Sequence, residues 1–544
     1  MMMLSAGNIF TTRTVLILLV LLLAFLLFNL GSWGVIETSE ARYAEISREM
    51  LLSGDWLHPR LLGIQHFHKP PVTYIISAFG MKLFGANAFG ARFFLQISLV
   101  LQALLVYLIG LNLFKEKRPA IIALIVYITI PAVLVSARNL TTDSFLTNFE
   151  LAAIWCWLEY KKAFRVSWLY SFYLLLALAF LTKGPVGLIF PVLVCIVYRS
   201  ENKPSASKKL HHFSGLLLLL LFGLSWYVYL MLQDKQFVDY FILKHTVQRV
   251  ANAQTFGRSK PWWFYLVLVP VLSLPWSAFL IIQYKKVKQL PQRHLRLFLL
   301  WIFVPLVFFS LSSSKLILYV LPLFAGMALL TGKLLNDFPD EKLKKTANFT
   351  VVFFLVLAIA LLLLQFLPLQ ISAPTWTTIF PLSIFAGIIF LWQKPMLHLY
   401  KILGTALLFT LILIPFSTFL LAENPVLTKS GKLLANFIKT KKLENRKIIV
   451  YDELLPSLAF HLQKDIISVY DKDKDLLRET QFETDENWRQ TLLNIHTKAD
   501  EIGLQELVKQ QPVLLVKGEI PSEQRWLLQH FPHNRQFGKW RVYY

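Results

Sequence analysis

Glu37–Tyr74 reads ETSEARYAEISREMLLSGDWLHPRLLGIQHFHKPPVTY and decides the fold, because it places acids, bases and aromatics between two lipid-soluble segments. The apolar run Val15–Leu30 precedes it and Ala88–Leu113 follows it. Apolar runs of about 20 residues cross a bilayer. The polar stretch is therefore predicted to be a first external loop, residues 34–87, held against one membrane face.

The spacing of side chains within this loop predicts a helix that lies in the membrane interface. Tyr43, Ile46 and Met50 fall on one side of this helix, and the charged residues Arg42, Glu45 and Glu49 fall on another. An amphipathic helix of this kind lies along a bilayer instead of crossing it. Its charged groups would thereby be held at the depth of the lipid headgroups.

The composition is that of a polytopic α-helical membrane protein. Of 544 residues, 56% are hydrophobic and 16% are charged, and the mean hydropathy is +0.54, which is too apolar for a soluble chain. Cys156 and Cys195 lie within apolar runs, so neither a disulfide framework nor a thiolate metal site is predicted. The net charge of +23 is spread between the apolar runs. That placement points to membrane lipids and excludes nucleic acid as a partner.

Hydropathy predicts about 13 membrane spans. They lie near residues 14–33, 88–114, 119–138, 143–160, 166–181, 184–199, 212–232, 262–283, 295–312, 315–332, 347–368, 375–393 and 402–421. With a cytoplasmic N-terminus, every basic cluster between spans falls on the cytoplasmic side, as the positive-inside rule requires. The first span is predicted to be retained, because no small-residue cleavage pattern follows it.

The external face then collects the unusual polar segments beside helix ends. These segments are 37–74, 138–143, 182–185, 239–263 and 312–315. Ionisable groups at such depths are costly and usually mark a functional site. For Lys183 and Lys315 the alternative is an interfacial anchor whose side chain reaches the headgroups.

A small soluble domain is predicted after Leu421, where Asn424-Pro425 ends the last apolar run. Strands are expected at Lys447–Tyr451, Ile466–Tyr470, Val513–Val516 and Trp540–Tyr543, with a short helix at Leu455–Leu462. The chain would thus comprise a transmembrane domain, residues 1–421, and an external α/β domain, residues 422–544. Neither glycine-rich nucleotide motif occurs in the latter, so nucleotide binding is not predicted.

Two acids are the candidate catalytic residues. Glu40 begins the interfacial helix, where the positive end of the helix dipole favours its ionised form, and Asp143 opens a later span. Brought to one external face by separate helices, the two could form one site. A carboxylate there could accept a proton from an acceptor hydroxyl or position the substrate. The alternative for each is an ordinary acid at a helix start.

Cations on the external side are suited to holding a phosphate or pyrophosphate. These candidate phosphate-binding residues are Arg42, Lys69, Arg138, Lys183, Arg249 and Lys315. The prolines after Lys69 predict an extended backbone there, and His68 and Tyr43 are further first-loop candidates. His58, His66 and His68 are crowded but lack zinc spacing. No cofactor is assigned, and a divalent metal is kept as an alternative.

Several separated motifs resemble those of one group of membrane glycosyltransferases. They are the first-loop sequence Ser39–Gly85, TTDSFL at Thr141–Leu146, LTKGPVGLIFP at Leu181–Pro191, the stretch from His245 to Trp276, and FFSLSSSKLILYVLPLFAG at Phe308–Gly326. Their order is similar to that in the lipid A aminoarabinose transferases and, more distantly, the protein O-mannosyltransferases. The similarity covers most of residues 35–335, and the later part is similar in layout.

This resemblance implies the GT-C fold and an inverting transfer of a hexosyl or pentosyl unit from a polyprenyl-phosphate donor. The acceptor would be a lipid A-type glycolipid, another envelope glycan or a protein. The enzyme would lie in the bacterial inner membrane, with its active site and C-terminal domain facing the periplasm.

The resemblance also assigns particular residues. It places Glu40 in the acidic first-loop motif, Lys69 in a Lys-Pro motif and Asp143 at a second acidic position. Ser39 and His68 stand where the family often has acids. Two carboxylates that would suit a cationic amino sugar are therefore absent from this chain.

A transporter or flippase for lipid-linked sugars is the competing prediction. Such a protein would carry ionisable residues near mid-bilayer or an internal repeat, and the sequence shows neither. A purely structural envelope subunit would leave the external charges unexplained. The sequence therefore favours a glycosyltransferase.

Overall fold

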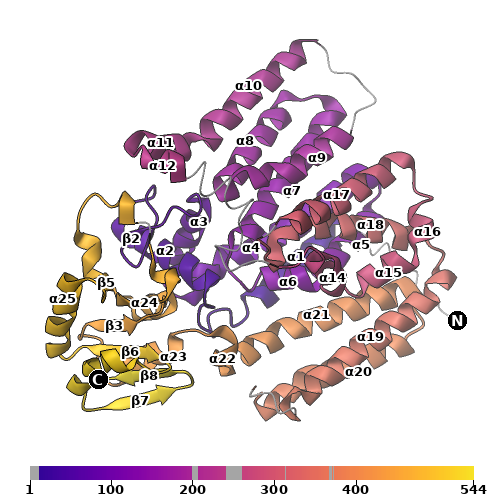
Figure 1. Ribbon diagram of the computed structural model, residues 1–544. Coiled ribbons are helices and arrows are strands. Elements are labelled where there is room, and N and C mark those ends of the chain that lie inside the picture. The colour runs from indigo at the N-terminus through magenta and orange to yellow at the C-terminus, as the bar shows by residue number, and fades with distance from the viewer. Residues whose placement is uncertain are drawn as a thin grey trace. The chain divides into compact units, whose positions relative to one another are not determined.

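Two compact units make up the chain in the computed structural model, which describes residues 11–198, 206–240, 260–312, 314–366, 371, 373–478 and 480–544 (Figure 1). The first unit comprises Met1–Asn29 and Leu95–Leu420, and the second comprises Leu30–Phe94 and Leu421–Tyr544. The first-loop segment thus shares a unit with the C-terminal segment. The sequence had instead suggested grouping the loop with residues 1–421.

Long apolar helices dominate the first unit. In the described part of the chain, 6 helical stretches are long and apolar enough to cross a membrane, or up to 8 if two bent pairs each form one span. The six are Ala88–Phe114, Val166–Val197, Gln292–Leu311, Asp340–Leu363, Thr375–Gln393 and His398–Glu423. The chain is therefore a multi-span membrane protein, while the count of about 13 spans stays a prediction.

The bent pairs fall where the sequence predicted single spans at 212–232 and 262–283. Leu210–Gly223 and Ser225–Gln233 meet at 46°, and Phe264–Val271 and Trp276–Ile282 meet at 105°. In the second pair Pro270 and Pro275 each lack the N–H that continues a helix, which accounts for the sharp turn. A segment bent this far either crosses as a broken span or returns to the same side. The orientation of everything after it depends on which of the two occurs.

The helices of the first unit follow the chain in order. They are α1 (Thr12–Leu27), α4 (Ala88–Phe114), α5 (Lys117–Ile128), α6 (Pro131–Ser136), α7 (Thr142–Ala163), α8 (Val166–Lys183), α9 (Ile189–Val197), α10 (Ala206–Gly223), α11 (Ser225–Gln233), α12 (Gln236–Asp239), α14 (Phe264–Val271), α15 (Trp276–Ile282), α16 (Tyr284–Val287), α17 (Gln292–Leu311), α18 (Leu323–Asp337), α19 (Lys344–Leu363), α20 (Ile379–Gln393) and α21 (His398–Glu423).

The core of this unit forms where small residues let helices approach closely. Helix α5 packs against α18 and is buried from Pro119 to Ile128. A Cβ added at Gly332 on α18 would lie 2.7 Å from the backbone nitrogen of Ala123 on α5. Close backbone contact at small residues is the usual basis of helix packing in membranes.

A six-stranded sheet forms the C-terminal part of the second unit, with the strand order β5-β4-β3-β6-β8-β7. The strands are β3 (Ile448–Tyr451), β4 (Ile467–Tyr470), β5 (Leu492–Asn494), β6 (Val513–Lys517), β7 (Asn534–Phe537) and β8 (Trp540–Tyr543), and helices α22 (Pro425–Thr428), α23 (Lys432–Thr440), α24 (Pro456–Leu462) and α25 (Lys498–Lys509) accompany them. Strands β3 to β6 are parallel neighbours, whereas β8 runs antiparallel to β6 and β7. The expected α/β domain, with four of these strands and α24, is confirmed.

Helix α2 (Ser39–Ser53) of the first loop is buried inside the second unit, where it packs against α3 (Val72–Phe84) and α24. The prediction of a polar side open to the headgroups is wrong for Glu45, which is fully buried. Its carboxylate is neutralised by Arg48, whose guanidinium lies 2.6 Å away. A bidentate, fully enclosed ion pair allows a charged helix face to be covered by protein.

A second acid of α2, the half-buried Glu49, holds the hairpin that follows it. Strands β1 (Arg60–Leu61) and β2 (Ile64–Gln65) are joined by Leu62 and Gly63, both at positive φ, as a two-residue hairpin turn requires. The Glu49 carboxylate accepts the N–H of Leu62 at 2.5 Å and that of Gly63 at 3.1 Å. Burial, with Glu45 close by, raises the pKa of Glu49 to about 8.

A third acid, Glu37, joins the two segments of the second unit; the residue is half-buried, with its Oε2 enclosed. Its Oε1 accepts the backbone N–H of Ser457 at 2.8 Å, and its own N–H donates to the Thr428 carbonyl at 3.0 Å. Burial raises the pKa of Glu37 from 4.5 to about 7. The folded state therefore binds a proton more tightly than the unfolded state does. The stability contributed by that proton is fully present below pH 4.5 and is lost as the pH rises through 7.

Replacing Glu37 with glutamine is expected to remove this loss, because the amide accepts from Ser457 without a charge to bury. At pH 8 the variant should be more stable than the parent by up to about 3 kcal/mol, and at pH 4.5 the two should be equal. Unfolding midpoints of the full-length protein at both pH values measure the difference. Glu506→Gln, at an exposed surface pair, is the control and should show no such gain. An equal shift at both pH values would contradict the assignment.

Candidate functional site

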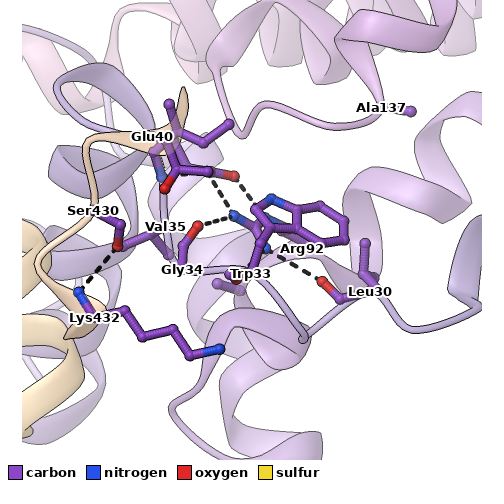
Figure 2. Close-up of polar contacts among 12 residues, drawn as sticks. Leu30, Trp33, Gly34, Val35, Glu40, Arg92, Ala137, Ser430 and Lys432 are labelled. Carbon is purple, nitrogen blue, oxygen red and sulfur yellow. Dashed lines mark hydrogen bonds and ion pairs between the residues drawn. The ribbon is translucent and has the colours of Figure 1, made fainter. Parts of the chain in front are cut away.

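Arg92, in the part of α4 that belongs to the second unit, lies at the centre of a buried polar cluster (Figure 2). Its Nε and one terminal nitrogen each lie 2.8 Å from a carboxylate oxygen of Glu40. The other N–H groups donate to the carbonyls of Leu30 at 3.3 Å, Trp33 at 3.2 Å and Gly34 at 2.9 Å. The guanidinium also lies 4.4 Å from the centre of the Trp33 ring. All five donors of the arginine are thus used.

Glu40, predicted as a catalytic acid, is fully occupied by this cluster. Besides its two bonds from Arg92 it accepts the N–H of Ile36 at 2.7 Å, and its side chain is 0% exposed. These contacts favour a role in positioning the first loop over one in proton transfer. The sequence analysis missed Arg92 because it stands within an apolar run. A single arginine in the first turns of a predicted span was the available signal.

The backbone beside Glu40 is held by residues of the C-terminal segment. A Cβ at Gly34 would lie 2.1 Å from Ser430 Oγ, so only glycine fits there. Lys432 donates to the carbonyl of Ser32, and His461 Nε2 accepts the N–H of Val35 at 3.3 Å. Burial, with Lys432 and Arg92 nearby, lowers the pKa of His461 to about 3. The imidazole is therefore a neutral acceptor at physiological pH.

The remaining first-loop candidates lie in the same second unit. The Arg42 guanidinium pairs with Asp475 at 2.9 Å, and the Tyr43 ring lies 5.4 Å from that of Tyr74. His68 lies in a turn with its ring 4.0 Å from that of His66. Lys69 is half-buried. The chain bends at Lys69, just before α3, whereas the prolines after it had predicted an extended segment.

In the first unit, Asp143 and Lys183 form one buried pair. Asp143 lies in the first turn of α7 and Lys183 ends α8. Lys183 Nζ lies 2.5 Å from Asp143 Oδ1, and the two side chains are 6% and 7% exposed. The same ammonium lies 3.9 Å from the ring centre of Tyr319, a cation–π contact. Tyr319 was not singled out, although it belongs to the motif at Phe308–Gly326.

Lys315 lies four residues before Tyr319 and is 3% exposed. Its ammonium donates to the carbonyls of Lys260 at 3.0 Å and Ser312 at 2.5 Å. Across the ranges that the structure describes, no carboxylate pairs with it. A buried ammonium whose charge is not neutralised is suited to an anionic ligand.

Three further ionisable residues, Arg138, Arg249 and Glu150, remain to be placed. An Arg138 terminal nitrogen donates to the Leu26 carbonyl at 3.0 Å, and Arg249 lies outside the described residues. Glu150, two turns after Asp143, is fully buried, and neither of its oxygens has a hydrogen-bond partner in the described chain. In the part of the chain that the structure describes, no group of three or more His, Cys, Asp or Glu is arranged to hold a metal.

The candidate residues are therefore divided between the two units. Glu40, with the first-loop candidates, belongs to the second unit, and Asp143, with Lys183 and Lys315, belongs to the first. Each acid is paired with a cation of its own unit. That Glu40 and Asp143 serve one site stays a prediction.

Sequence comparisons identify similar proteins over part of the chain. Residues 11–241 match the family described as dolichyl-phosphate-mannose-protein mannosyltransferase. The chain is 34% identical over 327 residues to undecaprenyl phosphate-alpha-4-amino-4-deoxy-L-arabinose arabinosyl transferase 2 of Pseudomonas fluorescens, covering 59% of each chain. It therefore spans less than two thirds of that relative's length.

Structural comparisons extend over nearly all of the chain. ArnT from Cupriavidus metallidurans, solved bound to undecaprenyl phosphate, superposes with a TM-score of 0.78 at 20% identity, covering 98% of both chains. The archaeal oligosaccharyltransferase AglB from Archaeoglobus fulgidus gives a TM-score of 0.51 at 12% identity, covering 93% of this chain and 69% of that one. Likeness at these identities establishes the fold.

Proposed function

We propose that this chain, which is ArnT-like and has the GT-C fold, is a polyprenyl-phosphate-dependent glycosyltransferase. Its match to the mannosyltransferase family over residues 11–241 supports the proposal. It would move a sugar to a glycolipid acceptor at the periplasmic face of the bacterial inner membrane. The observation that carries the proposal is the buried Lys183–Asp143 pair beside the Tyr319 ring, with the buried Lys315, which pairs with no carboxylate of the described residues, on the same segment as Tyr319.

The cations of this cluster would bind the phosphate of the donor. In an inverting transfer the acceptor oxygen attacks the anomeric carbon from the face opposite the phosphate, and the bond from that carbon to the phosphate oxygen breaks. Negative charge then develops on the leaving polyprenyl phosphate. Lys183 and Lys315, held in a site of low dielectric, stabilise that charge without having to reorganise.

The carboxylate would act on the acceptor. Once a phosphate competes for Lys183, Asp143 is released to orient an acceptor hydroxyl or accept its proton. An acceptor phosphate would need no base, and Asp143 would then serve only to position it. Lys69, Arg42, Arg138 and Arg249 are proposed as further phosphate contacts, and Glu40 as the residue that positions the first loop through Arg92.

Product formation by the purified full-length protein tests the proposal. Undecaprenyl-phosphate-linked sugar and a lipid A acceptor should yield a glycosylated acceptor, detected by its mass, with the anomeric configuration inverted relative to the donor. Asp143→Asn should slow transfer with little change in donor affinity. Movement of the donor across vesicles without any product would instead support the transporter alternative.

The choice of sugar follows from two residues of the first loop. Ser39 and His68 carry no carboxylate where the family often has acids, so a cationic amino group on the sugar would find fewer carboxylates here. We expect a neutral sugar donor to be used at least as well as its amino counterpart. His68→Glu should raise the relative use of the amino sugar by about tenfold, the value of one hydrogen bond to a charged group. Competition between the two donors, read by product mass, gives the ratio. An unchanged ratio would contradict the assignment.

A further inference from the structure

A hollow of about 430 Å³ lies at one end of the C-terminal sheet, far along the chain from the residues proposed for transfer. Its lining residues lie where β6 ends and where β7 turns into β8; these strands are labelled in Figure 1. Its lining includes Lys517, Glu519, Gln536, Lys539, Trp540 and Arg541. The volume is within the range of small-molecule sites and suits one or two sugar units.

Two glycines of the backbone border this hollow. Gly538, at positive φ, belongs to the two-residue turn between β7 and β8. Gly518, also at positive φ, donates its N–H to the Lys539 carbonyl at 2.8 Å and so ties the end of β6 to that turn. No atom lies within 4 Å of a Cβ built at either glycine. The absence of side chains at these positions keeps the entrance clear.

The charge of the lining is predominantly positive. Lys517, Lys539 and Arg541 outnumber the single acid Glu519, although Lys517 also pairs with Glu453 at 2.8 Å. Arg541 is half-buried, and its backbone lies in the ladder between β6 and β7, but among the described residues its guanidinium has no hydrogen-bond or ion-pair partner. A partly desolvated guanidinium without an acceptor favours a phosphate, which it can bind through two parallel bonds.

The other lining groups are those that recognise a sugar. Trp540 is half-buried: it lines the hollow and also packs against the apolar core of the unit, and aromatic rings at such positions pack well against flat ligand surfaces. Gln536 and Glu519 are exposed at the rim, where their amide and carboxylate groups can exchange hydrogen bonds with hydroxyls. Because the hollow opens at the end of the sheet, side chains from both faces of the strands reach it.

We propose that this hollow is a binding site for a phosphorylated saccharide, with Arg541 and Lys539 on the phosphate and Trp540 against the sugar ring. The ligand is either the headgroup of a phosphorylated glycolipid or a water-soluble sugar phosphate, and both have the same chemistry. The lining residues of this site belong to the second unit, whereas the proposed donor cluster belongs to the first. Its test measures binding, so its outcome is independent of whether the chain transfers sugar.

Isothermal titration of the full-length protein with glucosamine 1-phosphate tests the soluble ligand, and vesicles containing monophosphoryl lipid A test the lipid-borne one. The double variant Arg541→Gln with Lys539→Gln should weaken binding of at least one probe by tenfold or more, on the order of one charge-assisted hydrogen bond. Trp540→Ala should weaken it while leaving inorganic phosphate binding unchanged. The probe that responds identifies the source.

Arg535→Gln is the matched control, because Arg535 lies on β7, carries the same charge and contacts the rings of Phe437 and Phe537 outside the hollow. It should bind both probes as the parent does. If Arg535→Gln weakened binding of the probes as much as the double variant does, the effect would come from net charge alone, and the site would be overturned. Undiminished binding of both probes by the double variant, or no binding of either by the parent, would also overturn it. Inorganic phosphate binding as tightly as the sugar phosphate would remove the saccharide from the proposal.

Discussion

Replacing Arg92 with glutamine is expected to destabilise the second unit by about 3–5 kcal/mol, enough to lower the yield of folded protein sharply. The substitution leaves the Glu40 carboxylate buried without its cation and removes donors from the carbonyls of Leu30, Trp33 and Gly34. Arg92→Lys should restore little, because an ammonium has three donors and no planar fork. Limited proteolysis between residues 30 and 94 and the thermal midpoint of the full-length protein measure the loss.

Arg42→Gln is the matched control for Arg92. It removes the same charge from the same unit, but its partner Asp475 is 63% exposed. Surface pairs of this kind contribute at most about 1 kcal/mol. If the Arg92 and Arg42 variants resist proteolysis equally, the buried cluster does not hold the loop.

Replacing Lys183 with glutamine is expected to lower the rate of sugar transfer by about 10²–10³, the usual effect of removing one group that stabilises developing charge. The single substitution also leaves Asp143 buried and unpaired, which itself costs stability. The double variant Lys183→Gln with Asp143→Asn removes both charges and keeps the side-chain volumes. It should fold normally and remain inactive, which separates catalysis from folding.

A lysine in a comparable helix contact serves as the control for Lys183. Lys333 pairs with Asp337 at 2.8 Å within α18, with the two side chains 20% and 40% exposed. Lys333→Gln should retain nearly full transfer. Substantial transfer by the neutral double variant at saturating donor would show that the Lys183–Asp143 pair is structural.

The sequence predicted those elements whose apolar pattern is continuous. Strands β3 and β6 are buried hydrophobic runs in the centre of the sheet, so composition alone identifies them. Strand β7 is exposed over Asn534–Gln536 and pairs only with β8, and β5 is three residues long at the other edge. Strand β7 carries no apolar pattern, because an edge strand needs only its ladder of hydrogen bonds to form, and β5, with the two buried leucines Leu492 and Leu493, is too short to show a period.

Of the two buried ion pairs, Asp143–Lys183 and Glu40–Arg92, only the first could have been predicted from the sequence. Helices α7 and α8 are joined by Phe164 and Arg165 alone, so an antiparallel helix pair brings the start of α7 to the end of α8. The Asp143–Lys183 contact could thus have been inferred from the predicted spans. The Glu40–Arg92 contact could not, because it depends on how the whole first loop folds back onto the start of α4.

The second unit is discontinuous, and this determines when it can form during synthesis. Its first segment ends at Phe94 and its second begins at Leu421. At about 5–20 residues per second, ribosomal synthesis needs tens of seconds to pass between them. Throughout that interval Glu37 and Gly34 lack Ser457 and Ser430. The first-loop segment therefore cannot complete its packing until the C-terminal segment has been synthesised and has reached the same side of the membrane. A chain that terminates early would display an unmatched loop, and a protease could thereby distinguish it from a finished protein.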